Sequence, residues 1–287
     1  MSEAMAPKAL APGSPLWWAR LFALPERRSA FDALLAIRGE LVTTALGTTD
    51  PNVAGAKLSW WREELRRFGS GGEQHPATRA LASAEGGRDV EPEYLEEMLD
   101  GAEMDVAHRP CAAFSELRLY CHRTSGVLQE LLVVVTGTDS PRGERAVRNA
   151  AHRLGIGLRL AELACDFPAD LKSGRLYLPG DWLDDAGVSD DALVAERPDP
   201  ALAACLSRLA GEARQALDDA MADWPKGQKK RHRHAMVLAD LAKRRLDQAE
   251  ALSWIPATTA AGATRARRTL GDLVTAWRAA RRAVREG

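Results

Sequence analysis

Residues 161–179 read AELACDFPADLKSGRLYLP and close a run of apolar residues with helical spacing. Within this stretch Asp166 and Asp170 lie on one face if the helix continues through Asp170, because four residues make about one helical turn. Two such carboxylates can hold one Mg²⁺ together with the phosphate oxygens of a substrate. Lys172 and Arg175 follow closely and could contact the same anion. The stretch predicts a site for a Mg²⁺-bound diphosphate.

The same stretch also fits a plainer interpretation. Aspartate pairs at this spacing are common on solvated helix faces. Pro168 stands between the two aspartates, and a proline removes one backbone donor and crowds the preceding turn, so the helix can end before Asp170. Spacing alone leaves both interpretations open.

Composition limits the class of protein. The chain has 287 residues, 46% of them hydrophobic, which is enough for one large core. Its 39 basic and 40 acidic residues nearly cancel, so overall charge does not favour a nucleic-acid partner. The four cysteines are widely spaced, which favours reduced, buried thiols. No signal-like or membrane-spanning apolar run is found, and we expect a cytoplasmic protein.

Helical periodicity dominates the chain and predicts an all-α fold, with one helical domain over residues 17–287 after a disordered N-terminal segment, 1–16. Residues 125–136 and 154–165 are apolar around much of their circumference, which is typical of central helices in a bundle. Helices are predicted near residues 28–46, 51–68, 76–83, 91–107, 114–136, 142–165, 200–221, 231–253 and 266–285.

Six segments are informative when taken in order along the chain. They are LPERR (24–28), LSWWREEL (58–65), HP (75–76), DGAEMD (100–105), YCHRTSG (120–126) and LGIGLRL (154–160). Together they resemble the squalene/phytoene synthase family of head-to-head prenyl-diphosphate transferases. The resemblance implies a single isoprenoid-synthase-type helical bundle around a central cavity. In that fold two aspartate-rich motifs on facing helices hold Mg²⁺ and the diphosphates of two prenyl substrates.

The resemblance also implies roles for individual residues. Asp166 and Asp170 correspond to the second metal-binding motif. The residues expected to take part in catalysis are Asp166, Asp170, Tyr120 and Arg175. Those expected to bind substrate are Asp105, Arg159, Lys172, Tyr177 and Glu40. The implied ligands are an isoprenoid diphosphate or lipid, with Mg²⁺ if a diphosphate is bound.

The chain departs from the family where the first aspartate-rich motif is expected. Residues 36–45 read AIRGELVTTA, with no carboxylate at the motif positions and Glu40 out of register. Losing even one charge-stabilising group can slow a reaction by about 10²- to 10³-fold. Around the second motif and the Ser-Gly turn, the residues that replace the family's usual ones are Arg159, Glu162, Cys165 and Gln129.

These departures favour a degenerate member that binds an isoprenoid diphosphate or lipid, or acts as an assembly factor with a protein partner. Residues 31–45 look more like the divergent branch that includes a mitochondrial complex I assembly factor, regarded as non-catalytic. The alternative is an active Mg²⁺-dependent prenyltransferase that condenses two prenyl diphosphates. It would use Asp166 and Asp170 with substitute ligands, namely Glu40, Asp105 or Glu162.

Two basic segments could contact other molecules. Residues 226–234 read KGQKKRHRH, which is either a solvated helix start or a contact for anionic lipid at the inner face of the membrane. The last predicted helix combines many arginines with larger apolar residues, and we expect it to dock on the bundle or on a partner. Those apolar residues are Leu270, Leu273, Val274, Trp277 and Val284.

Overall fold

The computed structural model describes residues 12–138, 141–194, 199–254 and 263–286, and within these ranges the chain forms helices and no strand. The predicted all-α fold is confirmed. The α-helices are α1 (Pro15–Leu21), α2 (Arg28–Gly47), α3 (Pro51–Arg66), α4 (Pro76–Ser83), α5 (Pro92–Ala107), α6 (Phe114–Cys121), α7 (Val127–Thr136), α8 (Pro141–Lys172), α9 (Gly180–Ala186), α10 (Asp190–Val194), α11 (Pro200–Asp223), α12 (Arg233–Ala251) and α13 (Ala263–Glu286).

Helices begin where proline and a capping side chain occur together. Asp50 accepts a hydrogen bond from the backbone N–H of Asn52 at the start of α3, and Asp199 accepts one from Leu202 at the start of α11. Each cap precedes a proline at the first helical position, where the missing N–H costs nothing. The predicted starts of α3, α4 and α11 are therefore confirmed.

The structure corrects three of the predicted boundaries. The helix predicted over 114–136 is divided by a π-helical turn, His122–Gly126. Helix α8 continues past Cys165 to Lys172 with Pro168 inside it, so this proline does not end the helix. Helix α1 begins at Pro15, inside the segment predicted to be disordered, and the rest of that segment, residues 1–11, lies outside the described residues.

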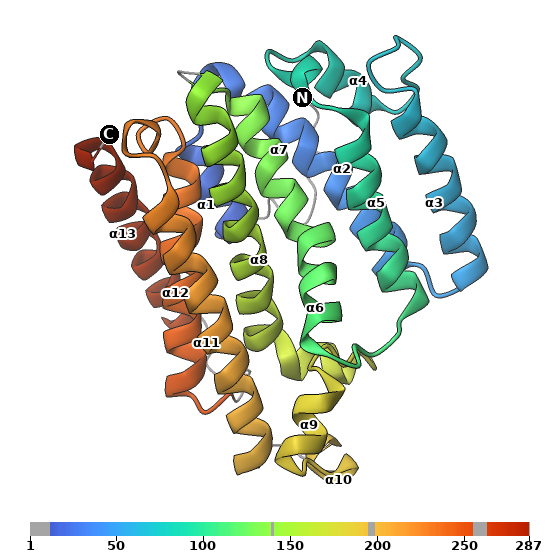
Figure 1. Cartoon of the computed structure of the whole chain (residues 1–287), viewed down its shortest axis with the longest axis vertical. Coiled ribbons are helices and arrows are strands. Elements are labelled where there is room, and N and C mark those ends of the chain that lie inside the picture. Colours follow the sequence, from blue (N-terminus) through green and yellow to red (C-terminus); the bar gives the residue numbers. More distant parts are fainter. Residues whose placement is uncertain (1–11, 139–140, 195–198, 255–262, 287) are drawn as a thin grey trace.

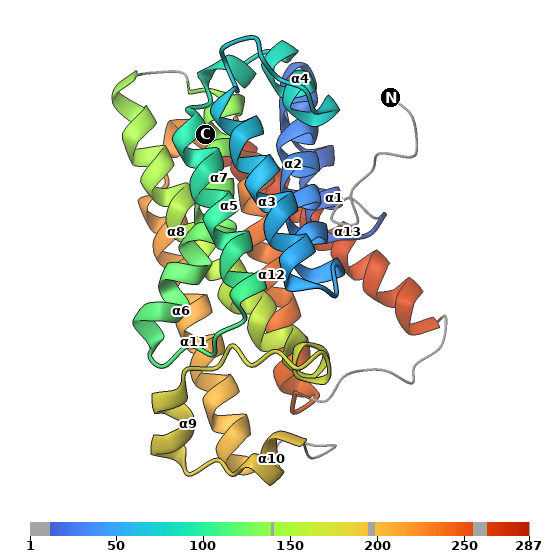
Figure 2. The ribbon, with the colours of Figure 1, turned by 90° about the vertical axis from the view of Figure 1, so that its right-hand side faces the viewer.

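Helix α8 occupies the centre of the bundle (Figure 1). It packs against α7, α11, α12 and the π-helical turn. One buried apolar cluster surrounds α8 and α11, and a second joins α2, α3, α5 and α7. The quarter-turned view places α8, α6 and α11 toward one side, α2, α3 and α13 toward the other, and α9 and α10 at the lower end (Figure 2).

Two further predictions concern the chain as a whole. Among the described residues, no helix combines the length and apolar character needed to cross a membrane. All four cysteines are free thiols, and Cys111, Cys121 and Cys205 are buried. Burial raises the pKa of the Cys111 thiol to about 11, which keeps it protonated and unreactive. The predicted reduced and mostly buried thiols are confirmed.

Candidate functional site

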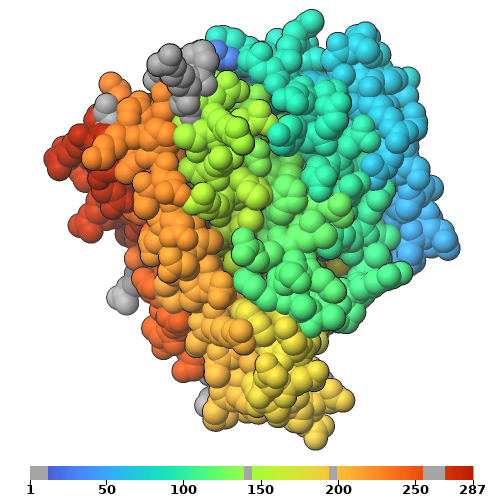
Figure 3. Space-filling model, in the orientation of Figure 1, coloured from blue at the N-terminus to red at the C-terminus, as the bar shows by residue number. Residues whose placement is uncertain are grey.

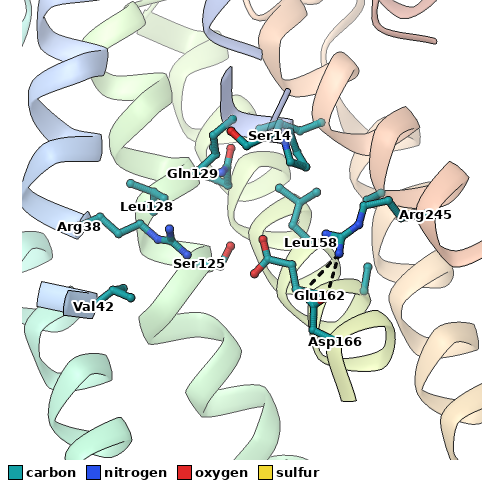
Figure 4. Close-up of a pocket in the computed structure, with 15 residues that line it drawn as sticks. Ser14, Arg38, Val42, Ser125, Leu128, Gln129, Leu158, Glu162, Asp166 and Arg245 are labelled. Atoms are coloured by element: carbon teal, nitrogen blue, oxygen red, sulfur yellow. Dashed lines mark hydrogen bonds and ion pairs between the residues drawn. The ribbon is translucent and has the colours of Figure 1, made fainter. Parts of the chain in front are cut away.

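A cavity of about 350 Å³ lies between α2, α7, α8, α12 and the start of α1 (Figure 4). Most of its wall is apolar, and charged side chains gather at one end. The apolar lining comes from Pro15, Leu16, Val42, Leu128, Leu158, Ala161, Leu238 and Ala242. The polar lining comes from Ser14, Arg38, Ser125, Gln129, Glu162, Asp166 and Arg245.

Helix α8 supplies a row of carboxylates at this end. Because the helix continues through Pro168, Glu162, Asp166 and Asp170 follow one another at intervals of four residues and share one face. This confirms the helical continuity on which the predicted aspartate pair depends. Glu162 accepts a hydrogen bond of 3.0 Å from Arg159 Nη1, one turn earlier on the same helix.

Asp166 is joined to an arginine of α12. Arg245 Nη2 lies 3.0 Å from Asp166 Oδ1 and 3.4 Å from Oδ2, the contact drawn as dashed lines in Figure 4. A guanidinium in this position offsets the charge of the carboxylate and competes with a metal ion for part of its lone pairs.

Arg38 enters the cavity from α2, on the side opposite Glu162 (Figure 4). Its Nε is buried and has no hydrogen-bond partner among the described residues. Burial lowers the pKa of the Arg38 guanidinium, and the negative charge of Glu162 opposes that change. Arg38 thus lines the cavity and carries a buried donor without a partner among the described residues, on the helix where the family resemblance places a metal-binding motif.

A second polar cluster lies beside the cavity and is centred on Asp105 of α5. Asp105 Oδ1 accepts hydrogen bonds of 2.9 Å from the hydroxyls of Tyr120 and Tyr177. Arg159 Nη2 donates to the Tyr120 hydroxyl at 2.5 Å, and Arg175 Nη1 donates to the backbone carbonyl of Asp105 at 3.2 Å. The structure therefore brings together five of the predicted site residues from α5, α6, α8 and the turn after α8.

Arg38 connects the two parts of the site. It lines the main cavity and also a smaller hollow of about 60 Å³ to which Asp105 and Arg159 contribute. Burial raises the pKa of the Tyr120 hydroxyl well above its ordinary value, so this tyrosine stays neutral and acts as a hydrogen-bond donor. The site therefore combines arginine and carboxylate side chains at the polar end of a largely apolar cavity.

Burial changes the titration of Asp170. It raises the pKa of this carboxyl group from 3.8 to about 6, while the charge of Arg159 acts in the opposite direction. The carboxyl group therefore takes up a proton at a higher pH than an ordinary aspartate does.

The structure places two predicted residues away from this cluster. Glu40 is exposed on α2 and lines a separate hollow with Trp60, Trp61 and His75. Lys172 is exposed at the last residue of α8.

The residues present do not fit a Mg²⁺ ion held between facing helices. In the described parts of the chain, no group of three or more His, Cys, Asp or Glu side chains is placed to hold a metal ion. Asp166 is ion-paired to Arg245, and the opposite helix contributes Arg38 where a ligand would be required. A cationic side chain and a divalent cation cannot share this space at low cost.

Sequence reasoning missed Arg38 and Arg245. Arg245 lies 79 residues beyond Asp166, so no local spacing connects the two. Arg38 lies within the segment that lacks the first aspartate-rich motif. The missing carboxylates are evident in the sequence there, whereas the role of the arginine is not. An arginine in that segment indicates positive charge at a place where the family resemblance implies carboxylates.

Comparison with known proteins identifies the family. The sequence profile described as squalene/phytoene synthase matches residues 13–271. The chain is 32% identical to the phytoene synthase of Mycobacterium tuberculosis over 202 residues, 69% of this chain and 62% of that protein. It is 28% identical to phytoene synthase 1, chloroplastic, of Solanum lycopersicum over 198 residues, 68% of this chain and 48% of that protein. The chain therefore spans less than two thirds of these relatives.

Solved structures agree on the fold. A dehydrosqualene synthase in complex with ligand superposes with a TM-score of 0.75 at 17% identity, covering 92% of this chain and 90% of that one. The squalene synthase HpnC from Alicyclobacillus acidocaldarius gives 0.72 at 20% identity, covering 83% and 89%. The predicted isoprenoid-synthase-type bundle is confirmed, and with the profile match it shows that the chain belongs to the squalene/phytoene synthase family.

Proposed function

We propose that this chain binds an isoprenoid with a phosphate-bearing head in the cavity beside α8 and does not condense two such molecules. The observation that carries the proposal is Arg38, which faces the α8 carboxylates from α2 in place of acidic ligands. The apolar wall of the cavity suits a prenyl chain, and Arg38 suits its anionic head.

The charge arrangement supports binding. A planar guanidinium can donate two parallel hydrogen bonds to one phosphate group. A buried donor without a partner, such as Arg38 Nε, costs about 1 to 3 kcal/mol, which an incoming phosphate oxygen would recover. Arg38 is therefore better suited to receive a ligand than to stabilise the empty fold.

The same arrangement argues against condensation. Ionising an allylic diphosphate requires several cations around the leaving group. Here Arg245 and Arg159 are already engaged with Asp166 and Glu162, and the side chains do not fit a metal ion held between facing helices. A bound diphosphate would remain intact. Mg²⁺ binding, an assembly role and its protein partner remain predictions from the sequence.

An incubation with substrate tests both parts of the proposal. The purified protein is mixed with farnesyl or geranylgeranyl diphosphate and Mg²⁺, and diphosphate release, C30 or C40 hydrocarbon and the melting temperature are measured. We expect a raised melting temperature without release or hydrocarbon. Turnover that disappears in Asp166→Asn but persists in the exposed control Asp185→Asn contradicts the non-catalytic assignment. An unchanged melting temperature with every ligand contradicts binding.

A further inference from the structure

Helix α13 contacts the rest of the protein through its smallest side chains. Over residues 269–286, where the structure describes exposure, the buried residues of α13 are alanines. Three of them, Ala276, Ala279 and Ala280, pack with Trp18 of α1 and with Val237 and Leu241 of α12, and Ala283 belongs to the cluster around α8 and α11. Small side chains let one helix approach others closely, so α13 lies tightly against the bundle. These alanines are Ala276, Ala279, Ala280 and Ala283.

The larger apolar residues of α13 face solvent. They are 44% to 62% exposed, and at 100° per residue they form one stripe along the helix. We expected the last helix to dock on the bundle or on a partner. It packs against α12 and α1 through its alanines, and the larger apolar residues lie on an adjoining face that the bundle does not cover. The stripe consists of Leu270, Leu273, Val274, Trp277 and Val284.

Positive charge borders this stripe. Arg281 lies over the Trp277 ring, with Cζ 4.6 Å from the ring centroid. Helical spacing places Arg278 and Arg285 on the same flank, both are exposed, and neither forms an ion pair with a described residue. Arg282 instead turns toward α12, where its Nη2 lies 2.7 Å from Asp240.

We propose that this face of α13 docks on an anionic lipid bilayer, with the helix lying along the membrane surface. An apolar stripe containing tryptophan, flanked by arginines, is the pattern of helices that insert at the boundary of headgroups and acyl chains. Basic residues near the surface are attracted to anionic lipids. The apolar exposure and the charge complementarity together favour a lipid surface over open water.

The basic segment before α12, residues 226–234, offers less positive charge for contact with lipid than its sequence indicated. Arg231 and Arg233 each donate to a backbone carbonyl, those of Gly137 and Phe22, and His232 and His234 are fully buried. Most of this segment therefore stabilises the fold.

The positions that remain exposed extend the charge of α13. Lys229 lies 2.9 Å from Glu286, which places the start of α12 beside the end of α13. Lys226 and Lys230 are exposed at this end of the molecule.

The main competing occupant is a second copy of the chain. A symmetric contact through the stripe would bring two rows of arginines close together, and like charges repel at such distances. The same arginines would contact lipid phosphates favourably. Charge therefore favours the bilayer.

A sedimentation experiment tests the apolar part of this surface. Full-length protein is mixed with vesicles of phosphatidylcholine alone or with phosphatidylglycerol added, and the bound fraction is measured. We expect binding to the anionic vesicles and a loss of about tenfold in Leu273→Ser/Trp277→Ser. The matched control is Trp60→Ser on α3, a residue 43% exposed, and it should bind as wild type does. Figure 3 shows α13 and α3 at opposite edges of the molecule.

A second pair of variants tests the charge. Arg278→Glu/Arg285→Glu should weaken binding to anionic vesicles by about tenfold or more, and Arg79→Glu/Arg118→Glu, at exposed sites elsewhere, should change it far less. Light scattering gives the oligomeric state of each protein. Equal binding by the α13 variants and wild type overturns the proposal. A wild-type dimer that these variants dissociate, without vesicle binding, assigns the surface to a second copy instead.

Discussion

Arg38 and Arg245 bring positive charge to the polar end of the cavity. Arg38 enters from α2, on the side opposite Glu162, and Arg245 forms an ion pair with Asp166 from α12. Asp105, Tyr120 and their partners could be assigned from family motifs, because each lies within a recognisable segment. Arg38 and Arg245 could not, because their role depends on contacts between distant helices.

Asp170 predicts a pH-dependent stability. Its pKa is about 6 in the fold and 3.8 ordinarily, so between these values the folded protein holds a proton that the unfolded chain has released. Stability therefore decreases as pH rises through this range. Because Asp170 is only half-buried, solvent screening reduces the effect to about 1 kcal/mol.

The measurement is urea unfolding of Asp170→Asn at pH 4 and pH 8. We expect the free energy of unfolding to rise by about 1 kcal/mol at pH 8 and to change little at pH 4. Asp185→Asn, at an exposed position on α9, should have no such pH-dependent effect. A loss of stability in Asp170→Asn that is larger at pH 8 than at pH 4 would show that the carboxylate is favourably paired, and would contradict this account.

Glu64 contrasts with Asp170: it is a fully buried carboxylate whose oxygens accept several hydrogen bonds. It accepts hydrogen bonds from the backbone N–H groups of Gln74 and His75 and from the Thr78 hydroxyl, and Arg67 lies 3.0 Å away. Burial alone would raise its pKa, but these hydrogen bonds bring the pKa below its ordinary value. It fastens α3 to the start of α4.

We expect Glu64→Gln to destabilise the protein by about 2 kcal/mol at pH 7. The NH₂ group of the glutamine would face hydrogen-bond donors from which the carboxylate oxygens now accept. Chemical denaturation measures this, with the exposed neighbour Glu63→Gln as control. The wild-type advantage should be present above pH 4.5 and disappear as the pH falls, because the folded pKa lies below that of the unfolded chain. A cost no larger than that of the control would contradict this role.

At the level of elements, a close contact positions α8 beside the π-helical turn. A Cβ added to Gly155 would lie 2.4 Å from the Ser125 carbonyl oxygen and 2.6 Å from Gly126 Cα. These are backbone atoms, so α8 itself would have to move. Because α8 carries Asp166 and Asp170, this contact determines where the carboxylates stand.

Gly155→Ala should therefore destabilise the protein by about 2 kcal/mol and weaken ligand binding as well. The control is Gly211→Ala on α11, where an added Cβ meets nothing within 4 Å. That change should stabilise the helix by about 0.5 to 1 kcal/mol. Thermal unfolding of both variants distinguishes them, and similar effects in the two would contradict a tight α8 contact.

Element boundaries show which parts of the fold the sequence can specify. Proline with a capping residue marks several helix starts, since both act locally. The π-helical turn is not visible in the sequence because it depends on how α6 and α7 pack against α8. The passage of α8 through Pro168 likewise depends on packing, which offsets one lost hydrogen bond. Helices α1, α9 and α10 are too short for periodicity to reveal.

At the scale of the whole molecule, the family fold is retained, and its cavity carries arginines as well as carboxylates at the polar end. The bundle superposes on synthases at low sequence identity, so the architecture tolerates wide substitution. The cavity keeps its apolar wall, which a prenyl chain requires, and the predicted cluster around Asp105. At the polar end of the cavity, Asp166 and Glu162 are paired with arginines.

The most direct test of the central claim is a calorimetric titration of farnesyl diphosphate in EDTA. We predict that farnesyl diphosphate binds without metal and that its Kd changes by less than about threefold when Mg²⁺ replaces EDTA. The affinity should fall by about tenfold or more in Arg38→Met, since a charge-assisted hydrogen bond contributes about 1.5 to 3 kcal/mol. Arg79→Met serves as control. Binding that requires Mg²⁺, survives in Arg38→Met and is lost in Asp166→Asn would contradict the account.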